Sequence, residues 1–595
     1  MFQPVRQVSV NFADNEKQSN KTFNILYFMK TNLVNLALGL AFTGGAVSCQ
    51  SQKNDLVFEH QGDTVTIVHI ARPANYLLLP IQESSKEGLV RLDTGSPADT
   101  DMDVRLATDS VEYYVPFALP QGSEEATVII KKVAADALCW DSIRVSDTFD
   151  TANRDKFRPV YHHTPLYGWM NDANGLVYKD GEYHLYFQYN PYGSVWGNMH
   201  WGHAVSKDLL HWVHQPVAAY PQIELNGCEG EYRGGAFSGS AVIEKDVMHL
   251  FYTRHFGKTD RSWQRQWQVT KQSKDGVHFT HEECAVWGTP EGVTWHFRDP
   301  KVVQIEDKWN MIIAGSCYDR PAVFRYESDD LKSWKYAGIL YGETDPQYGI
   351  AECPDFFYLD GTWVLIVSYI YADGRKDGRD VVWYTGTYKD GKFDPENKGL
   401  LDEGKDYYAP QSFEVEGERI SAGWNCHRLG QHIAQPGSAN GSLSLPRKLA
   451  VKNGKLYSQV IPQIQELFTE KAENGPYFLS MRKTKEIKES TVLSLAGSLA
   501  GKVNLYIGET ALKLTLEKED ADAKEQALPF VCQIQTDHPV EEITAYVDKA
   551  IIELFINGGE QACTRRFYLP KAVLRPVAEK TGAWSIDIKG MRSIW

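Results

Sequence analysis

Residues 176–187 read LVYKDGEYHLYF, which is an apolar run, an Asp-Gly turn and a second run that opens with a large side chain. An Asp-Gly pair between two such runs is a strong signal for a β-hairpin. Four more segments share the pattern: AVIEKDVMHLFY at 241–252, VVQIEDKWNMII at 302–313, FFYLDGTWVLIV at 356–367 and FEVEGERISAGW at 413–424. The repeat predicts five similar units of antiparallel sheet.

A second motif closes these units. It occurs as SKDLLHW at 206–212, SKDGVHF at 273–279, SDDLKSW at 328–334 and, more loosely, YKDGKF at 388–393. A spacing of roughly 60 residues, made of short strands, fits a four-stranded propeller blade with long loops. We therefore expect an all-β protein with a five-bladed β-propeller over residues 153–450. The alternative is a large sandwich or jelly roll in which the similarity is accidental.

Three acidic residues occupy matching places in these units. Asp172, Asp299 and Glu352 each precede, by 10 or 11 residues, the first large side chain after the hairpin turn, and Ser238 holds that place in the second unit. The first strands of propeller blades line the central axis, so equivalent positions converge at one end of it. The alternative is a turn-capping role, which does not require such a coincidence.

The composition and the acids together favour a neutral ligand. The formal charge of −15 argues against a nucleic-acid partner, and the aromatic share of 12% suits sugar binding. A pair of carboxylates facing a sugar is the usual apparatus of glycoside hydrolysis. Crowding several acids into a partly dehydrated funnel raises the pKa of at least one of them, and a third carboxylate can bind hydroxyls.

Several ordered motifs fill the same region: WMNDANG at 169–175, FQYNP at 187–191, WGNMHWGHAVSKDLLHW at 196–212, FSGS at 237–240, FRDP at 297–300, ECPD at 352–355, YYAPQSF at 407–413 and a Gly-Trp pair at 423–424. Together they closely resemble glycoside hydrolase family 32, the invertases, inulinases and levanases. The resemblance runs from about Arg158 to Trp595 and implies a five-bladed propeller followed by a β-sandwich. Ala173 departs from the pattern, because the family usually has Pro there. The loss of this Pro relaxes the backbone beside Asp172.

The resemblance implies a role for each acid. Asp172 is expected to be the nucleophile that attacks the anomeric carbon of a β-D-fructofuranosyl unit. Glu352 is expected to be the acid/base, and Asp299 the transition-state stabiliser. Covalent attack predicts retention of configuration, with the nucleophile and acid/base carboxyls roughly 5 to 5.5 Å apart. The residues that match substrate-binding positions of the family are Asn171, Asn174, Gln188, Trp196, Phe237, Ser238, Arg298 and Trp424.

Structural roles compete for several of these residues. Trp196 and Trp424 are core aromatics in the alternative interpretation, because propellers bury many aromatic side chains. Asp355 is expected on the opposite face of the strand from Glu352, as a structural residue. Cys353 is expected to pack between blades.

No cofactor or metal is expected for this reaction. His200 and His203 are separated by three residues, which places them on opposite faces of a strand, and no carboxylate or Cys completes a ligand set. We expect both to be packed or hydrogen-bonded scaffold residues.

The first 48 residues resemble a bacterial leader. From Met29, the expected true start, one Lys and an apolar run lead to Ala46-Val47-Ser48-Cys49, which fits a lipoprotein signal cleaved before Cys49 with lipid attached to its sulfur. The alternative is an ordinary secretory signal or short anchor in which Cys49 is incidental. Alternating apolar residues predict an accessory β-domain over 49–152 and a β-sandwich over 451–595. The accessory domain either binds polysaccharide or packs against the propeller, and packing is favoured.

These observations predict an exported, periplasmic or cell-surface lipoprotein. It is expected to be a retaining glycosidase that cleaves β-D-fructofuranosyl linkages in levan or inulin, with sucrose as a further substrate. Long loops around 221–235 and 258–268 favour exo action that releases fructose. The alternatives are an endo-acting levanase or inulinase, a fructosyltransferase, and a fructan-binding surface lipoprotein without catalysis.

Overall fold

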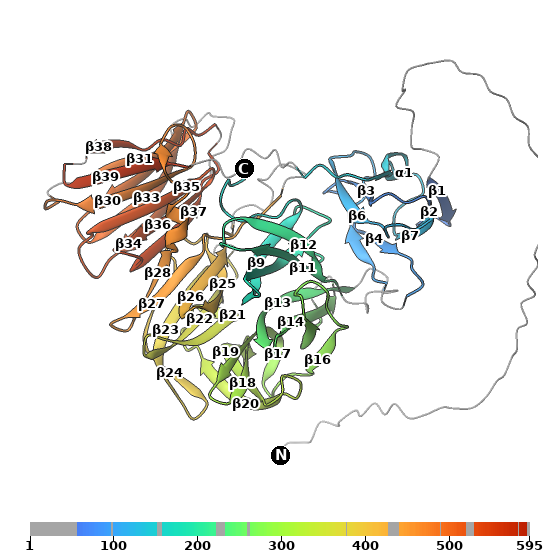
Figure 1. The fold of residues 1–595 in the computed structure, drawn as a ribbon, viewed down its shortest axis with the longest axis horizontal. Coiled ribbons are helices and arrows are strands. Elements are labelled where there is room, and N and C mark those ends of the chain that lie inside the picture. The colour runs from blue at the N-terminus through green and yellow to red at the C-terminus, as the bar shows by residue number, and fades with distance from the viewer. Residues whose placement is uncertain are drawn as a thin grey trace, which may run out of the picture. The chain divides into compact units, whose positions relative to one another are not determined.

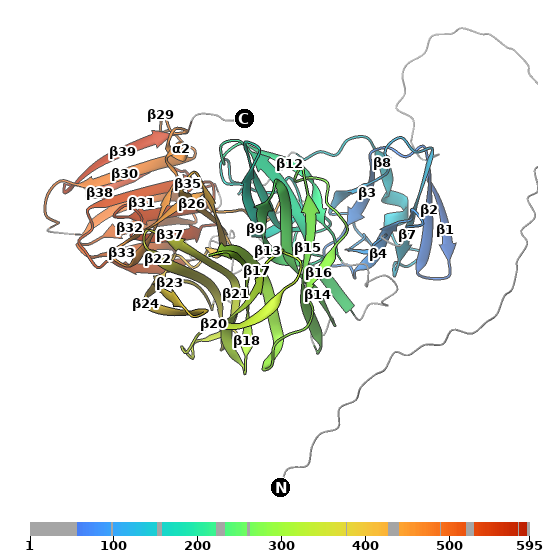
Figure 2. The same ribbon diagram turned by 60° about the horizontal axis from the view of Figure 1, so that its bottom comes forward.

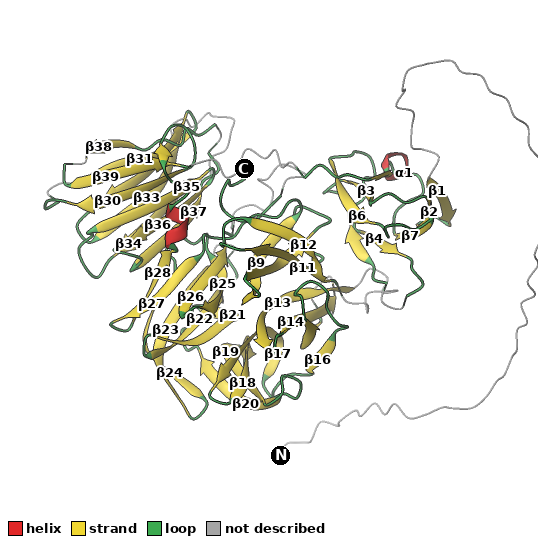
Figure 3. Cartoon of the chain, in the orientation of Figure 1, coloured by secondary structure: helices red, strands yellow, loops and turns green. Residues whose placement is uncertain are grey.

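The computed structural model describes residues 56–96, 99–151, 157–221, 232–258, 262–375, 378–426, 439–487, 490–518, 529–569, 571–580 and 582–591. The predicted leader and Cys49 lie outside these residues. Figure 3 shows that strands dominate, as predicted, with two short helices, α1 (Cys139–Ser142) and α2 (Pro462–Gln465). None of the described helices has the length and apolar character that a membrane span requires.

The middle of the chain forms five four-stranded antiparallel sheets, each built from four consecutive strands (Figure 1). The first three blades contain β9 (Trp169–Lys179), β10 (Glu182–Asn190), β11 (His200–Ser206) and β12 (Trp212–Ala219); β13 (Tyr232–Glu244), β14 (Val247–Lys258), β15 (Gln264–Ser273) and β16 (Glu283–Val286); and β17 (Val293–Ile305), β18 (Lys308–Cys317), β19 (Arg320–Ser328) and β20 (Lys335–Gly342). The last two contain β21 (Tyr348–Leu359), β22 (Thr362–Tyr371), β23 (Arg379–Lys389) and β24 (Lys392–Leu400); and β25 (Tyr408–Val415), β26 (Glu418–Trp424), β27 (Arg447–Lys452) and β28 (Lys455–Val460).

The five sheets close into a ring. Each first strand contacts the next in the order β9, β13, β17, β21 and β25, and β25 contacts β9 again. Beside the last blade, the Met170 N–H donates to the Asn440 carbonyl at 2.8 Å, and the Asn440 N–H donates to the Gly168 carbonyl at 2.8 Å. The predicted five-bladed propeller is confirmed, and its first strands surround the axis.

The motif at the end of three blades is a hydrogen-bonded turn. The carboxylates of Asp208, Asp275 and Asp330 each accept hydrogen bonds from backbone N–H groups two and three residues further on. Such turns link the third strand of a blade to the fourth. The looser fourth copy differs: Asp390 lies in a tight hairpin turn with a φ of 51°, where Lys389 pairs with Lys392.

The fifth blade extends beyond the predicted boundary. Strand β28 follows β27 through the tight turn at Asn453-Gly454 and pairs with it in register. The propeller therefore ends at Val460 and not at residue 450. The sequence pattern could not show this, because a hairpin looks the same whichever sheet it joins.

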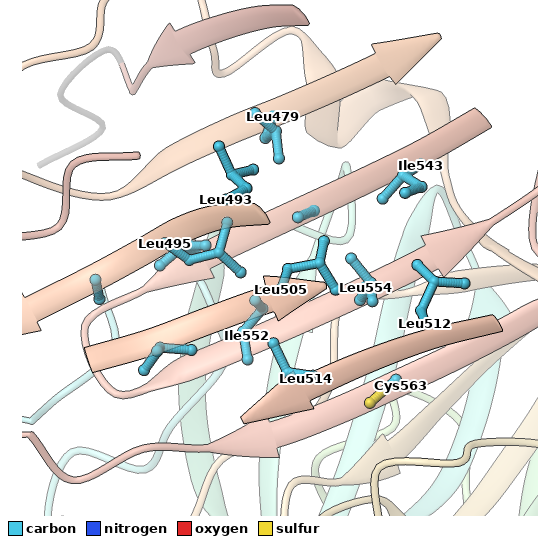
Figure 4. Close-up of a cluster of buried hydrophobic side chains, with 14 of the residues drawn as sticks. Leu479, Leu493, Leu495, Leu505, Leu512, Leu514, Ile543, Ile552, Leu554 and Cys563 are labelled. Atoms are coloured by element: carbon cyan, nitrogen blue, oxygen red, sulfur yellow. The ribbon is translucent and has the colours of Figure 1, made fainter. Parts of the chain in front are cut away.

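The C-terminal domain is the predicted β-sandwich. One sheet has the order β29-β39-β30-β35-β36-β37 and the other β34-β33-β32-β31-β38. Figure 4 shows the leucine- and isoleucine-rich core, to which both sheets contribute buried side chains. Its strands are β29 (Glu470–Lys471), β30 (Tyr477–Lys483), β31 (Thr491–Ser498), β32 (Gly501–Ile507), β33 (Ala511–Lys518), β34 (Phe530–Gln535), β35 (Glu542–Asp548), β36 (Ile551–Ile556), β37 (Gln561–Arg566), β38 (Val577–Lys580) and β39 (Trp584–Gly590).

The segment before the propeller is a small antiparallel β-domain with its own core, as predicted. It contains a five-stranded sheet, β1-β2-β7-β4-β5, and a three-stranded sheet, β6-β3-β8, whose strands are labelled in Figure 2 apart from β5 and β6. Buried Val68, Leu79, Val128 and Ile130 belong to its core. Its strands are β1 (Leu56–Gln61), β2 (Val65–Ala71), β3 (Tyr76–Ile81), β4 (Gly88–Leu92), β5 (Met102–Val104), β6 (Tyr113–Ala118), β7 (Glu125–Lys131) and β8 (Arg144–Ser146).

Five buried charged residues join the propeller to the sandwich, and we call them the interface cluster: His162, Asp402, Arg447, Asp548 and Glu553. The Arg447 guanidinium binds Glu553 at 2.7 Å and Asp402 at 3.1 Å. The two ring nitrogens of His162 lie 2.9 Å from Asp548 and 3.0 Å from Glu553. Sequence analysis did not identify this cluster, because its members lie far apart in the chain.

Candidate active site

Every first strand of the propeller carries a two-residue bulge near the axis. In each blade, two successive residues stand opposite a single residue of the second strand. The bulged pairs are Asn171–Asp172, Phe237–Ser238, Asp299–Pro300, Cys353–Pro354 and Ala409–Pro410. A bulge bends a strand and redirects its side chains, so this ring of bulges creates a specialised end of the axis.

The bulges correct one prediction. Asp172, Asp299 and Glu352 are not at equivalent positions: Asp172 is the second bulged residue, Asp299 is the first, and Glu352 directly precedes its bulge. Of the four residues predicted to be equivalent, only Ser238 shares the place of Asp172. Counting residues from the hairpin turn fails because the distance from bulge to turn differs between blades, and the first blade contains a second irregularity. The acids nevertheless come from the same short section of three of the five first strands, β9, β17 and β21.

Three of the bulges use an unusual backbone conformation. Asp299, Cys353 and Ala409 have φ values of 64°, 46° and 48°, and each precedes a proline. Proline suits a bulge because it has no ladder hydrogen bond to make there. Such positive φ values in residues other than Gly cost about 1–3 kcal/mol each and are typical of functional sites.

The bulges bring Asp172 and Asp299 to one thiol. The Cys353 Sγ atom lies 3.5 Å from Asp299 Oδ2 and 3.8 Å from Asp172 Oδ2. The Cys353 N–H donates to Asp299 at 2.9 Å, and the Ser238 hydroxyl donates to Asp172 at 2.7 Å. Cys353 is buried, as expected, but it lies between the carboxylates and does more than fill space between blades.

Glu352 is held by two donors of its own. Arg298 Nη2 lies 2.7 Å from Glu352 Oε1, and the Tyr408 hydroxyl donates to Oε2 at 2.5 Å. Arg298 also lies 3.9 Å from Asp299. We call Asp172, Arg298, Asp299 and Glu352 the axial cluster. It places three acids and one permanent cation within one network.

The surroundings move the pKa values of the acids apart. Burial raises the pKa of Asp299 to about 7, since the attraction of Arg298 is opposed by the charges of Glu352 and Asp172. Burial also raises the pKa of Asp172, although the Ser238 hydrogen bond limits the shift. Burial disfavours ionised Glu352 too, but Arg298, Arg379 and the Tyr408 hydroxyl outweigh it and lower its pKa.

The expectation of at least one raised pKa is confirmed, but the raised values fall on Asp299 and Asp172. In the ligand-free site Glu352 is ionised, and the first proton taken up near neutral pH goes to Asp299 and its partners. Coupled acids of this kind titrate as a group.

Comparison with known proteins decides the family. The model "Glycosyl hydrolases family 32 N-terminal domain" matches residues 162–460, and "Glycosyl hydrolases family 32 C terminal" matches residues 468–588. The chain belongs to glycoside hydrolase family 32. It is therefore a glycosidase, and the resemblance seen in the motifs is confirmed.

Individual relatives of this family 32 chain differ in their described activities. A sucrose-6-phosphate hydrolase of Escherichia coli is 30% identical over 440 residues, covering 69% of this chain and 89% of that protein. A levanase of Bacillus subtilis is 35% identical over 340 residues, covering 52% of this chain and 47% of the levanase. A family 32 structure from Bifidobacterium adolescentis aligns with a TM-score of 0.66 and 25% identity, covering 89% of this chain and all of that one. Residues 62–161 match a domain of unknown function (DUF4980).

Several residues that match family 32 sugar positions hold the propeller together in this structure. The Asn174 side chain is fully buried and accepts a hydrogen bond from the Gly239 N–H at 3.2 Å. Gln188 donates to the Ala236 carbonyl at 2.9 Å. Asn171 accepts a hydrogen bond from the Trp169 indole at 3.0 Å. These bonds join or stiffen the first two blades, and direct sugar contacts by the three amides stay predictions.

The two candidate tryptophans have opposite environments. Trp196 is 42% exposed and packs its ring on Phe237, which stacks in turn on His255. Trp424 is 7% exposed and packs against Trp169. The exposure of Trp196 favours a binding role, whereas burial of Trp424 favours the core role that was its alternative.

Two residues of the site, Tyr408 and Arg379, were not predicted from the sequence. Tyr408 lies in the quoted YYAPQSF motif, which was its only signal. Arg379 opens strand β23, its guanidinium lies 5.0 Å from the centre of the Tyr408 ring, and its charge lowers the pKa of both Glu352 and Asp172. No motif surrounds Arg379, so its position follows only from the fold.

The residues expected to be structural are so. Asp355 is buried and pairs with Lys301 at 3.0 Å. Its expected place on the opposite face from Glu352 is wrong, because the bulge between them sets both residues against the same face of β22. His200 is bound to the Asn198 carbonyl at 2.6 Å, and His203 stacks on Tyr186. Burial lowers the pKa of both histidines to about 3, so they are neutral.

Ala173 is fully buried beside Asp172 and pairs with Phe187. The β-ladder therefore fixes the backbone next to this carboxylate.

Proposed function

We propose that this protein is a retaining β-fructofuranosidase. In this proposal Asp172 is the nucleophile, Glu352 the acid/base and Asp299 the stabiliser of the transition state. The observation that carries the proposal is the axial cluster, in which three acids from three first strands share one hydrogen-bonded network. Structural acids rarely need such unequal pKa values, whereas acid and base catalysis does.

In the first step, Asp172 attacks the anomeric carbon of the fructosyl unit and forms an ester with it. Glu352 gives its proton to the leaving oxygen, which departs as an alcohol. In the second step, ionised Glu352 takes a proton from water, and the resulting hydroxide releases fructose from Asp172 with overall retention. Ser238 orients the Asp172 carboxylate, and Asp299 accepts hydrogen bonds from ring hydroxyls.

Glu352 must be protonated when the first step begins, although Arg298 holds it ionised in the empty site. We infer that a bound sugar supplies new acceptors for Arg298 and excludes water from Glu352. Both effects raise the pKa of Glu352, because they weaken its cation partner and increase its burial. A proton shared by the acidic group can then reside on Glu352.

The favoured substrates are fructans such as levan and inulin, with sucrose as a shorter alternative. The levanase among the relatives supports the fructan assignment, and exposed Trp196 offers an indole face to the apolar side of a sugar. The expected long loop at 258–268 is wrong, because residues 264–268 belong to β15. Exo action that releases fructose is therefore proposed from the long connection between β12, which ends at Ala219, and β13, which begins at Tyr232.

A time course of products from levan, inulin and sucrose, separated by chromatography, tests the assignment. Fructose alone from the earliest points is the expected result. Early mixed oligosaccharides would replace exo with endo action, and fructosylated products longer than the substrate would indicate transfer. Absence of any product from all three sugars would contradict the enzymatic proposal and favour a fructan-binding lipoprotein.

We further propose that the protein is exported and lipid-anchored through Cys49. The lipobox-like Ala46-Val47-Ser48-Cys49 supports this. Expression with radiolabelled palmitate should label the wild type in the membrane fraction and not a Cys49→Ala variant. Equal labelling of both, or none of either, would overturn the anchor.

A further inference from the structure

The N-terminal domain contacts the propeller at a loop that carries one candidate sugar-binding residue. This loop, which we call the Trp196 loop, comprises residues 191–199 between β10 and β11. The Trp196 ring lies 6.0 Å from the ring of Phe237. Phe237 directly precedes Ser238, whose hydroxyl holds the Asp172 carboxylate. Trp196 therefore packs against the residue that directly precedes Ser238, which binds the proposed nucleophile.

Two anchors from the N-terminal domain flank Trp196. Glu83 Oε1 accepts hydrogen bonds from both the backbone N–H and the hydroxyl of Ser194, at 2.8 and 2.6 Å. On the other side, the Asn198 amide donates to the Asp103 carbonyl at 3.2 Å. Ser194 and Asn198 each lie two residues from Trp196, so the domain holds the loop on both sides of the indole.

Glu83 is itself fixed and charged. The Tyr113 hydroxyl donates to the same carboxylate oxygen, and Arg105 lies 3.3 Å from the other. Burial opposes ionisation, but hydrogen bonds from Ser194 and Tyr113 and the charge of Arg105 outweigh it and lower the pKa of Glu83. Hydrogen bonds to a charged acceptor are stronger than those between neutral groups, so this anchor is a firm one.

Further contacts tie the same region together. The Tyr192 ring packs 5.9 Å from Phe117 of the N-terminal domain. Glu87, which binds Arg105 at 3.1 Å, also pairs with Arg233 on β13, the strand that carries Phe237. The N-terminal domain thus contacts both segments that carry this pair of rings, namely the Trp196 loop and strand β13 with Phe237.

The loop itself has little regular structure to hold its shape. Asn198 has a φ of 45° and Gly197 a φ of 155°, and no strand includes residues 191–199. Within the propeller, Asn190 donates to the Val195 carbonyl at 3.0 Å. Binding residues on loops depend on such scaffold contacts for their positions.

We propose that the N-terminal domain completes the sugar site by fixing Trp196, and that Glu83 is the positioning residue. The inference deepens the proposed function, on which it rests for the nature of the ligand, a fructosyl unit covered by the indole face. Loss of Glu83 leaves the axial cluster intact but lets the Trp196 loop move. Substrate binding weakens, whereas the chemical step on bound substrate is preserved.

The test uses the full chain and a double-mutant cycle between Glu83→Ala and Trp196→Ala, with the fructoside that the wild type hydrolyses. Glu83→Ala is expected to raise KM about 10-fold, with kcat within about 2-fold, because a charged anchor of this strength is lost. In the Trp196→Ala background the same change should leave KM unaltered, since Glu83 acts through the indole. Glu83→Gln, which keeps a carbonyl acceptor, should recover part of the loss. Glu125→Gln, an exposed site on β7 of the same domain, is the control and should match the wild type.

An unchanged KM in Glu83→Ala, or an equal KM increase in both backgrounds, would overturn the proposal. Hydrogen–deuterium exchange gives a readout without substrate: residues 191–199 should exchange faster in Glu83→Ala than in Glu125→Gln. Equal exchange would also overturn it. If the wild type hydrolyses no fructoside, the proposed function fails, and the exchange result still decides whether Glu83 positions the loop.

Discussion

The axial cluster and the interface cluster contain the same kinds of side chain, but the pKa values of those side chains shift in different ways. Both are buried groups of acids around an arginine. In the interface cluster, burial alone would lower the pKa of His162, but hydrogen bonds to Asp548 and Glu553 raise it to about 9. Arg447 and His162 also lower the pKa of Glu553, so every one of these shifts favours the charged form. In the axial cluster, two acids have raised pKa values and one has a lowered value.

The difference lies in the number of fixed donors. The two cations of the interface cluster bind its three acids, and the backbone N–H groups of Val160 and Leu445 complete the acceptors. On the axis, Arg298 makes its shortest contact with Glu352, and the charge of Arg379 also favours ionised Glu352 and Asp172. When every buried acid has enough donors, the network stabilises one charge state. When donors are too few, protons can move among the acids.

The largest expected effect is on the axis. Asp172→Asn should lower kcat/KM for fructoside hydrolysis by about 10⁴-fold or more, because the nucleophile is lost. Its unfolding midpoint should not fall, since the change relieves a buried acid. Asp180→Asn, in the exposed hairpin turn of the same blade, should keep wild-type activity. Steady-state kinetics and a urea titration measure both, and retained hydrolysis in Asp172→Asn would contradict the assignment.

The reverse pattern is expected at the interface. Glu553→Gln leaves Arg447 and His162 short of a buried partner and should reduce the free energy of unfolding by about 3–5 kcal/mol. The remaining folded protein should keep the wild-type kcat. Glu541→Gln, an exposed change in the same domain, should cost less than about 1 kcal/mol. A loss of kcat without loss of stability in Glu553→Gln would remove the distinction between the two clusters.

Only part of this comparison could be predicted from the sequence. Hairpin signals such as Asp180-Gly181 have a local cause, so they predicted five sheets and the region of the acids. The offset among Asp172, Asp299 and Glu352 was not predictable, because a bulge is a property of two paired strands. Arg447 and Glu553 lie in different domains, and nothing local marks them as partners. Recognition of the family 32 motifs supplied the roles of the acids, which spacing alone left open.

The stability of the protein should fall on the alkaline side of neutrality. The pKa of His162 is about 9 in the folded protein against 6.5 for an ordinary histidine, so its stabilisation is complete below pH 6.5. It is lost as the pH rises through 9. Urea midpoints measured across this range should decline in the wild type and decline less in His162→Gln. Parallel curves would show that His162 is not the titrating group.

A smaller effect is expected from replacing Arg298, the cation of the axial cluster. Arg298→Gln removes the strongest of the charges that lower the pKa of Glu352, so the alkaline limb of kcat/KM against pH should move to higher pH. Activity should fall as well, because Arg298 is also a candidate sugar ligand. Arg320→Gln, exposed in the same blade, should leave the profile in place. An unshifted limb in Arg298→Gln would mean that Glu352 does not control it.

The central claim is that the axial cluster works through a covalent fructosyl ester on Asp172. Incubation of Glu352→Gln with β-D-fructofuranosyl fluoride, whose leaving group needs no proton, should slow the second step and accumulate that ester. Peptide mass spectrometry should then find one added fructosyl unit on the peptide that contains Asp172. No adduct, or an adduct on the peptide that contains Asp299, would contradict the account.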